Sequence, residues 1–182
     1  MSWAFAASFA VAFAVAALAY LGLGYGAAAL LFQAPPERFY ARGISFEAPK
    51  GWQCEGQGLE TVCDPPSAVD DAVLIIATKT VEPFDTLETY RGILKAPKES
   101  GTQHGKFSTV LSEGDTDLGG HIWVDATHRG SEIESYDTRY LATTIGATAV
   151  LMTFSCHTPA CPALQPELDH LAASVEVLNP GS

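Results

Sequence analysis

The longest pattern in the chain is an unbroken apolar run near its start. Residues 1–36 contain no Asp, Glu, Lys or Arg, and the first charged residue is Glu37. Within this stretch, residues 3–32 are almost wholly apolar. As a helix they would extend about 45 Å at roughly 1.5 Å per residue, which exceeds the roughly 30 Å thickness of a bilayer core. The pattern predicts an N-terminal transmembrane anchor over residues 1–34, followed by a linker over 35–42.

A secretory signal is the alternative interpretation of the same stretch. Such signals have a basic start, an apolar core of about 7–15 residues and a small-residue cleavage site. Here the start is only Met-Ser and the apolar run is longer, but three alanines at 27–29 offer a cleavage site. We favour a retained anchor, and cleavage of the segment stays open.

Two faces of the expected anchor carry side chains suited to helix packing. Phe5, Phe9 and Phe13 recur every four residues and share one face. Gly22 and Gly26 have the G-x-x-x-G spacing that permits two membrane helices to approach closely. Alanine and glycine are common in membrane helices, so this spacing also arises by chance. These five residues are the candidates for helix packing in the membrane.

After residue 42 the pattern changes to short segments of alternating or β-branched apolar residues. A strand is expected at 42–50, and two more surround a Gly-rich turn within 51–66. Residues 72–81 are apolar at both odd and even positions, which predicts a strand buried on both faces. Further strands are expected at 107–113, 121–129, 135–144 and 148–156, with turns at 119–120 and 145–147.

Two segments have helical periodicity. Residues 85–95 begin with Asp85 and have Glu88 three positions later, similar to a capping box. The expected buried stripe of this helix is Leu87, Tyr90, Ile93 and Leu94. A second helix is expected to open at Gln165-Pro166, with proline in its first turn. Strands, a helix, more strands and a final helix indicate an α+β domain over 43–182 with a mostly antiparallel sheet.

The charge of the molecule belongs to this domain. All 10 Lys and Arg and all 21 Asp and Glu follow residue 36, so the net charge of −11 is carried by the polar part of the chain. An acidic surface repels phosphate backbones and anionic lipid heads. The composition therefore disfavours nucleic-acid binding.

The cysteines suggest an oxidising compartment. The four cysteines fall into two local pairs, Cys54 with Cys63 and Cys156 with Cys161. The spacing of the first pair is a poor match to metal sites, and an even count beside an export or membrane segment favours disulfides. Four cysteines permit three pairings, and we favour the two local ones because short loops close at the lowest entropic cost.

The side of the membrane is indicated by two conflicting signals. Arg38 and Arg42 follow the apolar run, and the positive-inside rule would then place the domain in the cytoplasm. That rule is weak for long translocated domains, whereas disulfides are rare in the cytoplasm. We expect a single-pass membrane protein whose C-terminal domain lies in the periplasm or the extracellular space.

The order of these segments resembles the PsbP-like fold family, which includes PsbP, the bacterial DcrB proteins and the Ran-binding Mog proteins. The resemblance covers residues 43–178, and its matching segments are GISFEAPKGW, VLIIATKT, DTLETYRGIL, GGHIWVDATHRG, AVLMTFSC and LAASVEVL. These are signatures of strand, turn and helix order, not catalytic motifs. The resemblance implies an α-β-α sandwich that is usually without enzymatic activity and often serves as an accessory subunit at membranes. The cysteine pairs and the anchor depart from the family, so no partner is carried over.

Candidate chemistry is sparse. Serine-nucleophile, phosphate-binding and dinucleotide-binding motifs are absent from the sequence. His121 and His128 have opposite parity on one expected strand and would face opposite sides of the sheet, so they would not share a metal ion. The acids of 113–117 are a weak candidate for loose cation binding. Trp123, His121 and Asp125 share one parity and form a candidate protein interface, with the aromatic ring partly exposed.

These observations lead to a non-enzymatic accessory or assembly subunit of a membrane protein complex, which contacts the bilayer through its N-terminal helix. No cofactor, metal or catalytic residue is expected. A periplasmic module that binds a small ligand or a lipid is the alternative function. A metal-dependent hydrolase is the least favoured function, because the sequence contains no motif that would supply the reacting groups.

Overall fold

The structure is a computed structural model, and it describes residues 38–41, 43–57, 59–66, 72–158 and 160–178. The expected anchor lies outside the described residues, as do its candidate packing residues Phe5, Phe9, Phe13, Gly22 and Gly26. Within the described ranges, every helix is too short or too polar to cross a bilayer.

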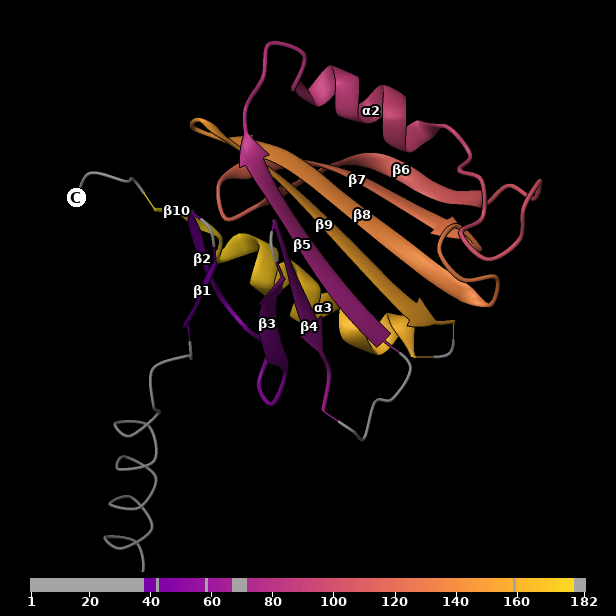
Figure 1. The fold of residues 1–182 in the computed structure, drawn as a ribbon, viewed down its shortest axis with the longest axis horizontal. Coiled ribbons are helices and arrows are strands. Elements are labelled where there is room, and N and C mark those ends of the chain that lie inside the picture. Colours follow the sequence, from indigo (N-terminus) through magenta and orange to yellow (C-terminus); the bar gives the residue numbers. More distant parts are fainter. Residues whose placement is uncertain (1–37, 42, 58, 67–71, 159, 179–182) are drawn as a thin grey trace, which may run out of the picture. The chain divides into compact units, whose positions relative to one another are not determined.

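Seven strands form one antiparallel sheet (Figure 1). In chain order they are β3 Gln53–Gln57, β4 Glu60–Asp64, β5 Ala72–Thr80, β6 Thr109–Leu118, β7 His121–Arg129, β8 Tyr136–Ile145 and β9 Thr148–His157. Their order in the sheet is β3-β4-β5-β9-β8-β7-β6, and every neighbouring pair is antiparallel. The expected antiparallel α+β domain is confirmed.

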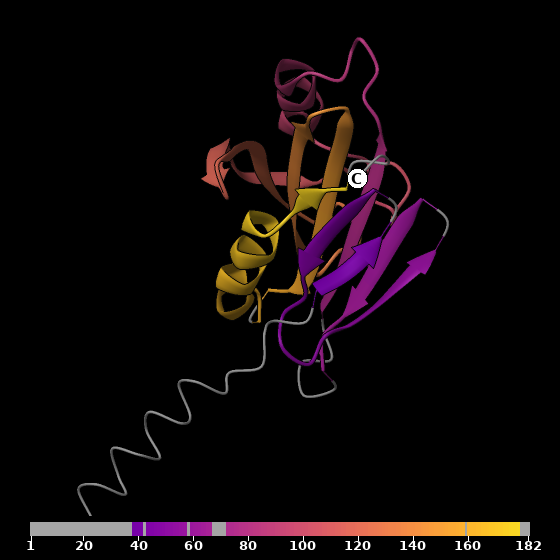
Figure 2. The same cartoon turned by 90° about the vertical axis from the view of Figure 1, so that its left-hand side faces the viewer.

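A smaller sheet and two helices complete the described part of the domain. The smaller sheet consists of β1 Arg38–Ala41, β2 Ile44–Glu47 and β10 Glu176–Val177, in the order β1-β2-β10. The helices are α2 Leu87–Lys95 and α3 Cys161–Ala173. Figure 1 shows α2 on one side of the seven-stranded sheet and α3 on the other, and Figure 2 shows β10 leading from α3 to β1 and β2.

The face of the large sheet that α3 covers is filled with large apolar side chains. Because side chains alternate along a strand, every second residue of β5, β7, β8 and β9 points to this face. Its largest buried strand residues are Leu74, Ile76, Trp123, Leu141, Met152 and Phe154. Ile44 and Phe46 of β2 and Leu164, Leu168 and Leu171 of α3 close over them. We call this side the closed face.

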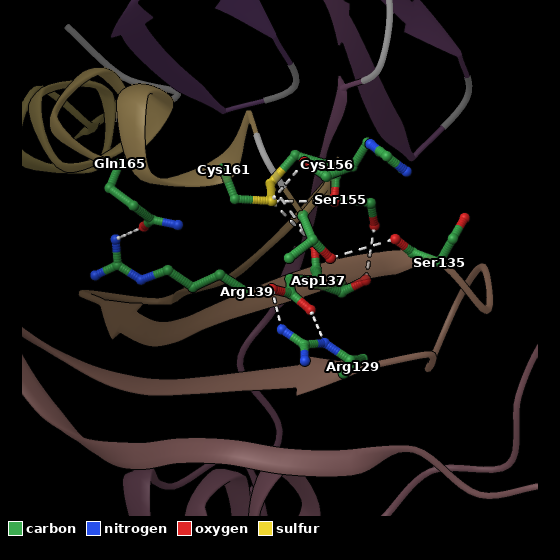
Figure 3. The surroundings of a disulfide bond; sticks show 11 residues. Arg129, Ser135, Asp137, Arg139, Ser155, Cys156, Cys161 and Gln165 are labelled. Carbon is green, nitrogen blue, oxygen red and sulfur yellow. Dashed lines mark hydrogen bonds and ion pairs between the residues drawn. A yellow bond between two sulfur atoms is a disulfide. The ribbon is translucent and has the colours of Figure 1, made fainter.

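Both expected disulfides are present. Cys54 and Cys63 lie directly opposite each other in β3 and β4 and are bonded. Cys156 near the end of β9 is bonded to Cys161 at the start of α3, as Figure 3 shows. Cys63, Cys156 and Cys161 are part of the buried cluster of the closed face, so the two crosslinks stabilise that side of the sheet.

The turn between β6 and β7 lies against α3. Gly119 and Gly120 both have positive φ, as the expected Gly-Gly turn requires. A Cβ added to Gly119 would lie 2.1 Å from the carbonyl oxygen of Ala173, whereas one added to Gly120 would meet no atom within 4 Å. Glycine at 119 is therefore required both by its backbone conformation and by the close approach of the end of α3.

The starts of both helices differ from the expectation. The N-cap of α2 is Thr86, whose hydroxyl accepts a hydrogen bond from the Thr89 N–H, and the helix begins at Leu87. Asp85 does not cap it, because its carboxylate accepts hydrogen bonds from the Glu82 N–H and the Tyr90 hydroxyl. The second helix starts at Cys161, so Pro166 lies within α3, where its missing N–H removes one backbone hydrogen bond.

The acids of 113–117 lie on β6, which extends beyond the strand expected at 107–113. Because β6 extends to Leu118, Glu113 and Asp115 both point to the α2 side. There Glu113 pairs with Lys95 at 3.1 Å, and Asp115 pairs with Arg91 at 2.6 Å. These carboxylates are neutralised by the basic side of α2. In the part of the chain that the structure describes, no group of three metal-ligating side chains gathers.

Strand β5 is buried on one face only, contrary to the expectation. Leu74 and Ile76 are buried on the closed face. On the other face Val73, Ile75 and Ala77 are only partly covered, because α2 contacts β6, β7 and β8 and leaves β5 beside it open. The end of this uncovered strip, at Ala77, forms part of the candidate site.

Candidate functional site

A groove runs between α2 and strands β5, β8 and β9, with a volume of about 470 Å³. Its lining is predominantly apolar and includes four large apolar side chains that are at least 38% exposed: Leu59, Phe84, Ile93 and Leu151. We call this concave surface the α2 groove. Its size and lining are those of small-ligand sites in proteins.

The floor of the α2 groove consists of small side chains. Leu151 of β9 lies in register between Ala77 of β5 and Ala142 of β8. Ala149, the next residue of β9 on the same face, pairs with Lys79. Where the closed face has Trp, Phe and Met, the floor of the groove has alanines, so the space beside α2 is not filled.

The wall contributed by α2 is amphipathic. Leu94 is buried against the sheet, with Leu87 and Tyr90 partly buried beside it. Ile93, expected in the buried stripe, is 54% exposed. Ile93 directly precedes the buried Leu94 and lies on the side of α2 that faces the groove. It therefore lines the groove instead of the core.

One end of the groove carries a neutralised lysine. The ammonium of Lys79 is 3.0 Å from Asp85 and 3.1 Å from Glu82, and it lies 5.2 Å from the centre of the Phe84 ring. The hydrogen bonds to Asp85 and Glu82 raise the pKa of Lys79. The Glu82 N–H, followed by Lys79 and Tyr90, lowers the pKa of Asp85. At this end of the groove, the ammonium and the two carboxylates are therefore paired with one another.

Tyr90 connects these paired charged groups to the groove wall. Its hydroxyl donates to Asp85 at 3.0 Å. Burial and this hydrogen bond raise the pKa of Tyr90 to about 12, so the phenol stays protonated. The side chain acts as a neutral, half-buried part of the lining.

The other end of the groove carries Lys98. Its ammonium lies 5.0 Å from the centre of the Tyr140 ring. The ion pairs formed by lysines of the described residues involve Lys79, Lys95 and Lys106, but not Lys98. Lys98 is therefore the groove cation that no carboxylate neutralises within the described part of the chain.

A buried histidine fixes the chain beneath this end. His128 has no exposed surface, and its Nε2 lies 2.7 Å from the Leu94 carbonyl oxygen. A carbonyl only accepts, so Nε2 carries the proton and Nδ1 accepts from the Ser108 hydroxyl at 2.9 Å. Burial lowers the pKa of His128, opposed by the Leu94 carbonyl and assisted by the charge of Lys98. The neutral ring is thus a structural link between α2 and β7.

The predicted interface of Trp123, His121 and Asp125 does not form an exposed aromatic surface. Trp123 has no exposed surface and belongs to the closed-face core, so the expectation of a partly exposed ring is wrong. The reason is that this parity of β7 faces α3. His121 and Asp125 are half-buried on the same side. His121 and His128 lie on opposite faces, as predicted.

Asp125 is engaged in holding α3. Arg139 donates to both of its carboxylate oxygens, at 3.0 and 2.6 Å. The same guanidinium donates to Gln165 at 2.6 Å and to Asp169 at 2.7 Å on α3, and Figure 3 shows Arg139 extending towards Gln165. Burial lowers the pKa of Arg139, but its hydrogen bonds to Asp125 and Asp169 outweigh this and raise it.

A second cleft, of about 250 Å³, adjoins the α2 groove. It lies between β1 and strands β4 and β5 and shares Leu59, Glu60 and Thr78 with the groove. Tyr40 of β1, which is 66% exposed, stands at its side. We call it the Tyr40 cleft.

Comparison with known proteins identifies the fold. No family model and no curated protein matches the chain. The solution structure of cyanobacterial PsbP (CyanoP) from Synechocystis sp. PCC 6803 is similar, with a TM-score of 0.52, 14% identity, and coverage of 78% of this chain and 91% of that chain. The Saccharomyces cerevisiae Ran-binding protein Mog1p is similar with a TM-score of 0.53, 12% identity, and coverage of 79% of this chain and 95% of that chain. The chain therefore has the PsbP-like fold that its sequence resembles.

Proposed function

We propose that this chain is a non-enzymatic accessory module whose domain binds the apolar part of a ligand in the α2 groove. The observation that carries the proposal is the gathering of large exposed apolar side chains around one concave surface: Leu59, Phe84, Ile93 and Leu151. Soluble domains rarely leave such side chains together in water unless they meet a ligand or a partner.

The non-enzymatic role is supported by what the polar groups near the groove do. His128 is held between Leu94 and Ser108. The Tyr140 hydroxyl donates to Glu132 at 2.6 Å, and burial raises its pKa so that it stays protonated. Asp85 is engaged by Lys79 and Tyr90. These groups stabilise the fold around the groove and are not poised to react.

We also propose that the domain lies outside the cytoplasm, anchored by residues 1–34. The two disulfides and the charge-free apolar run support this location. Alkylation of intact cells without a reductant should label none of the four cysteines, and the full chain should stay with the membrane after carbonate extraction. Full cysteine labelling would contradict the oxidising compartment, and release by carbonate would contradict the anchor.

The groove itself is tested by filling it. Ala77→Phe places a ring on the groove floor, and Thr80→Phe adds the same ring to an exposed position of β5 outside the groove. Native mass spectrometry of the full chain purified from its own cells should detect a bound small molecule. We expect that mass with wild type and Thr80→Phe and not with Ala77→Phe. An unliganded wild-type chain, or equal loading of both variants, would contradict the proposal.

A second candidate function, as an accessory or assembly subunit of a membrane protein complex, is favoured by the Tyr40 cleft. Exposed tyrosines are enriched in protein interfaces, and the similar Mog1p is a Ran-binding protein, so this fold can present a protein-binding surface. Purification of the full chain in mild detergent should yield a stoichiometric complex, weakened by Tyr40→Ala. A monomer at native expression would contradict this function.

A further inference from the structure

We propose that the ligand of the α2 groove is a single-chain amphiphile with a carboxylate head, bound with the head at Lys98 and the hydrocarbon chain directed towards Phe84. This inference rests on the proposed function and adds to it the charge class and the orientation of the ligand.

The charge class follows from the pairing of the lysines. In a domain whose acids greatly outnumber its bases, carboxylates neutralise Lys79, Lys95 and Lys106. Lys98 and the exposed Lys50 are the lysines without a carboxylate partner among the described residues, and only Lys98 lines the groove. A half-buried, unneutralised cation beside an apolar surface is complementary to an anionic head on an apolar chain.

The position of Lys98 is fixed by a chain of hydrogen bonds. Its N–H donates to the Ser108 hydroxyl at 2.9 Å, and its carbonyl accepts from the Ser108 N–H at 2.7 Å. Ser108 in turn donates to His128, which donates to Leu94 in α2. The backbone beneath the ammonium is thus tied both to β7 and to the helix that forms the groove wall, as a preorganised binding group requires.

The orientation follows from the opposite end. There Lys79 is already satisfied by Asp85 and Glu82, and Glu60 also lines the groove. An anionic head would be repelled by these carboxylates, whereas a methyl end would meet Phe84 and the nearby Leu59, which are each 60% exposed. At the Lys98 end, Glu132 accepts a hydrogen bond from the Tyr140 hydroxyl and forms no ion pair with Lys98. The charges of the two ends therefore favour one direction.

The middle of the groove suits a hydrocarbon chain. Between the two ends, Ile93 faces a floor of Leu151 flanked by Ala77 and Ala142. The nine residues of α2 extend about 13 Å along this surface. Since each buried methylene tightens binding about fourfold, affinity should rise with chain length until the groove is filled.

The experiment uses the full chain in phosphatidylcholine nanodiscs with photoactivatable probes. Dodecanoate and dodecanol, each with a diazirine at the end of the chain, are cross-linked and mapped to peptides. We expect both to label the groove in competition with unlabelled dodecanoate, with dodecanoate labelling about tenfold more strongly, as for a hydrogen-bonded charge. The label should lie at 59–60 and 82–85. Dodecanoate with its diazirine beside the carboxylate should label 96–98 and 140.

Matched variants isolate the lysine. Lys98→Met keeps the length of the side chain and removes its charge, and Lys50→Met makes the same change at an exposed turn outside the groove. We expect Lys98→Met to bring the ratio of dodecanoate to dodecanol labelling close to one. Lys50→Met should leave the ratio unchanged, and dodecanol labelling should persist in both variants, which reports that the fold is intact.

The outcomes separate this inference from the proposed function. Equal labelling by the two wild-type probes, or reversed positions of the two diazirines, overturns the charge or orientation assignment and leaves an apolar binding groove. No groove labelling by either probe overturns both. A benzoylphenylalanine at position 93 that captures a second copy of the chain, or residues 3–32 of this chain, also overturns the proposal, because protein would then cover the groove.

Discussion

The two faces of the seven-stranded sheet are built from the same strands but are covered to different extents. On the closed face Met152 and Phe154 of β9 are buried under α3 and β2. One residue along β9, on the other face, Leu151 is 38% exposed between two alanines. Every strand contributes to both faces because its side chains alternate. The difference therefore arises from the size of the side chains at alternate positions and from where each helix lies.

This contrast suggests a division of roles. The closed face contains the largest buried side chains, both disulfides and the Arg139 cluster that holds α3. It can supply stability without the other face being filled. The α2 face is then free to keep an open apolar surface, which would be a liability in a domain that depended on it for its core.

The largest expected effect comes from a substitution at the edge of the closed face, where the β6–β7 turn contacts the end of α3. Gly119→Ala would place a Cβ 2.1 Å from the Ala173 carbonyl oxygen, so the end of α3 must move. We expect a loss of about 4 kcal/mol of unfolding free energy, measured by urea denaturation followed by tryptophan fluorescence. Gly120→Ala shares the positive φ but meets open space, and should cost about 1 kcal/mol. Equal losses would show that backbone conformation alone explains both glycines.

The second prediction compares the faces directly with neighbouring residues of β9. Met152→Ala removes a fully buried side chain and should cost about 3 kcal/mol in the same denaturation experiment. Leu151→Ala removes a partly exposed one and should cost less than about 1 kcal/mol. Ligand binding should respond in the opposite way, with the larger loss for Leu151→Ala. Similar stability losses would mean that Leu151 is part of the core and not of an open groove.

Much of the fold was predictable because its signals are local. Apolar and alternating segments located the ends of β5, β7, β8 and β9 to within one residue, and paired glycines located the β6–β7 turn. Strand β6 extends five residues beyond its expected end at 113. Both helices begin at residues other than those predicted, because the hydrogen-bond partner of a side chain near a helix start depends on residues distant in the sequence. Asp85 is attracted to Lys79 and Tyr90, so Thr86 takes the cap instead. Alternation identifies two faces but not which of them α3 covers, and this is why the Trp123 ring was expected to be partly exposed.

The α2 groove could not be derived from the sequence. Its floor requires the register that places Ala77 and Ala142 beside Leu151, and these residues are far apart in the chain. Its cation requires the knowledge that Lys98 lacks an acidic neighbour in space. The available signal was the recurrence of alanine at strand positions whose partners on the other face are large, and it acquires meaning only when the sheet order is known.

The third prediction concerns the crosslink between β9 and α3. Replacing Cys156 and Cys161 with alanine removes a short-loop disulfide and should cost about 2 kcal/mol of unfolding free energy. Because both cysteines lie on the closed face, groove labelling by the dodecanoate probe should be unchanged under native conditions. The measurement is denaturation of the double variant beside wild type. A loss of groove binding without unfolding would contradict the independence of the two faces.

The smallest expected effect tests the hydrogen bonds through which His128 links α2 to the sheet. Since burial lowers the pKa of His128 in the folded chain, the unfolded chain binds a proton near pH 6.5 that the folded chain does not. Stability should therefore fall as pH drops below about 6.5, by up to about 1.4 kcal/mol per pH unit, until the folded pKa is reached. His128→Gln should lose this component of the slope, whereas His104→Gln, at a fully exposed side chain, should keep it. Parallel slopes in wild type and His128→Gln would mean that the ring is protonated in the fold. Its Nδ1 would then no longer accept from Ser108, and the hydrogen-bonded support proposed beneath Lys98 would be absent.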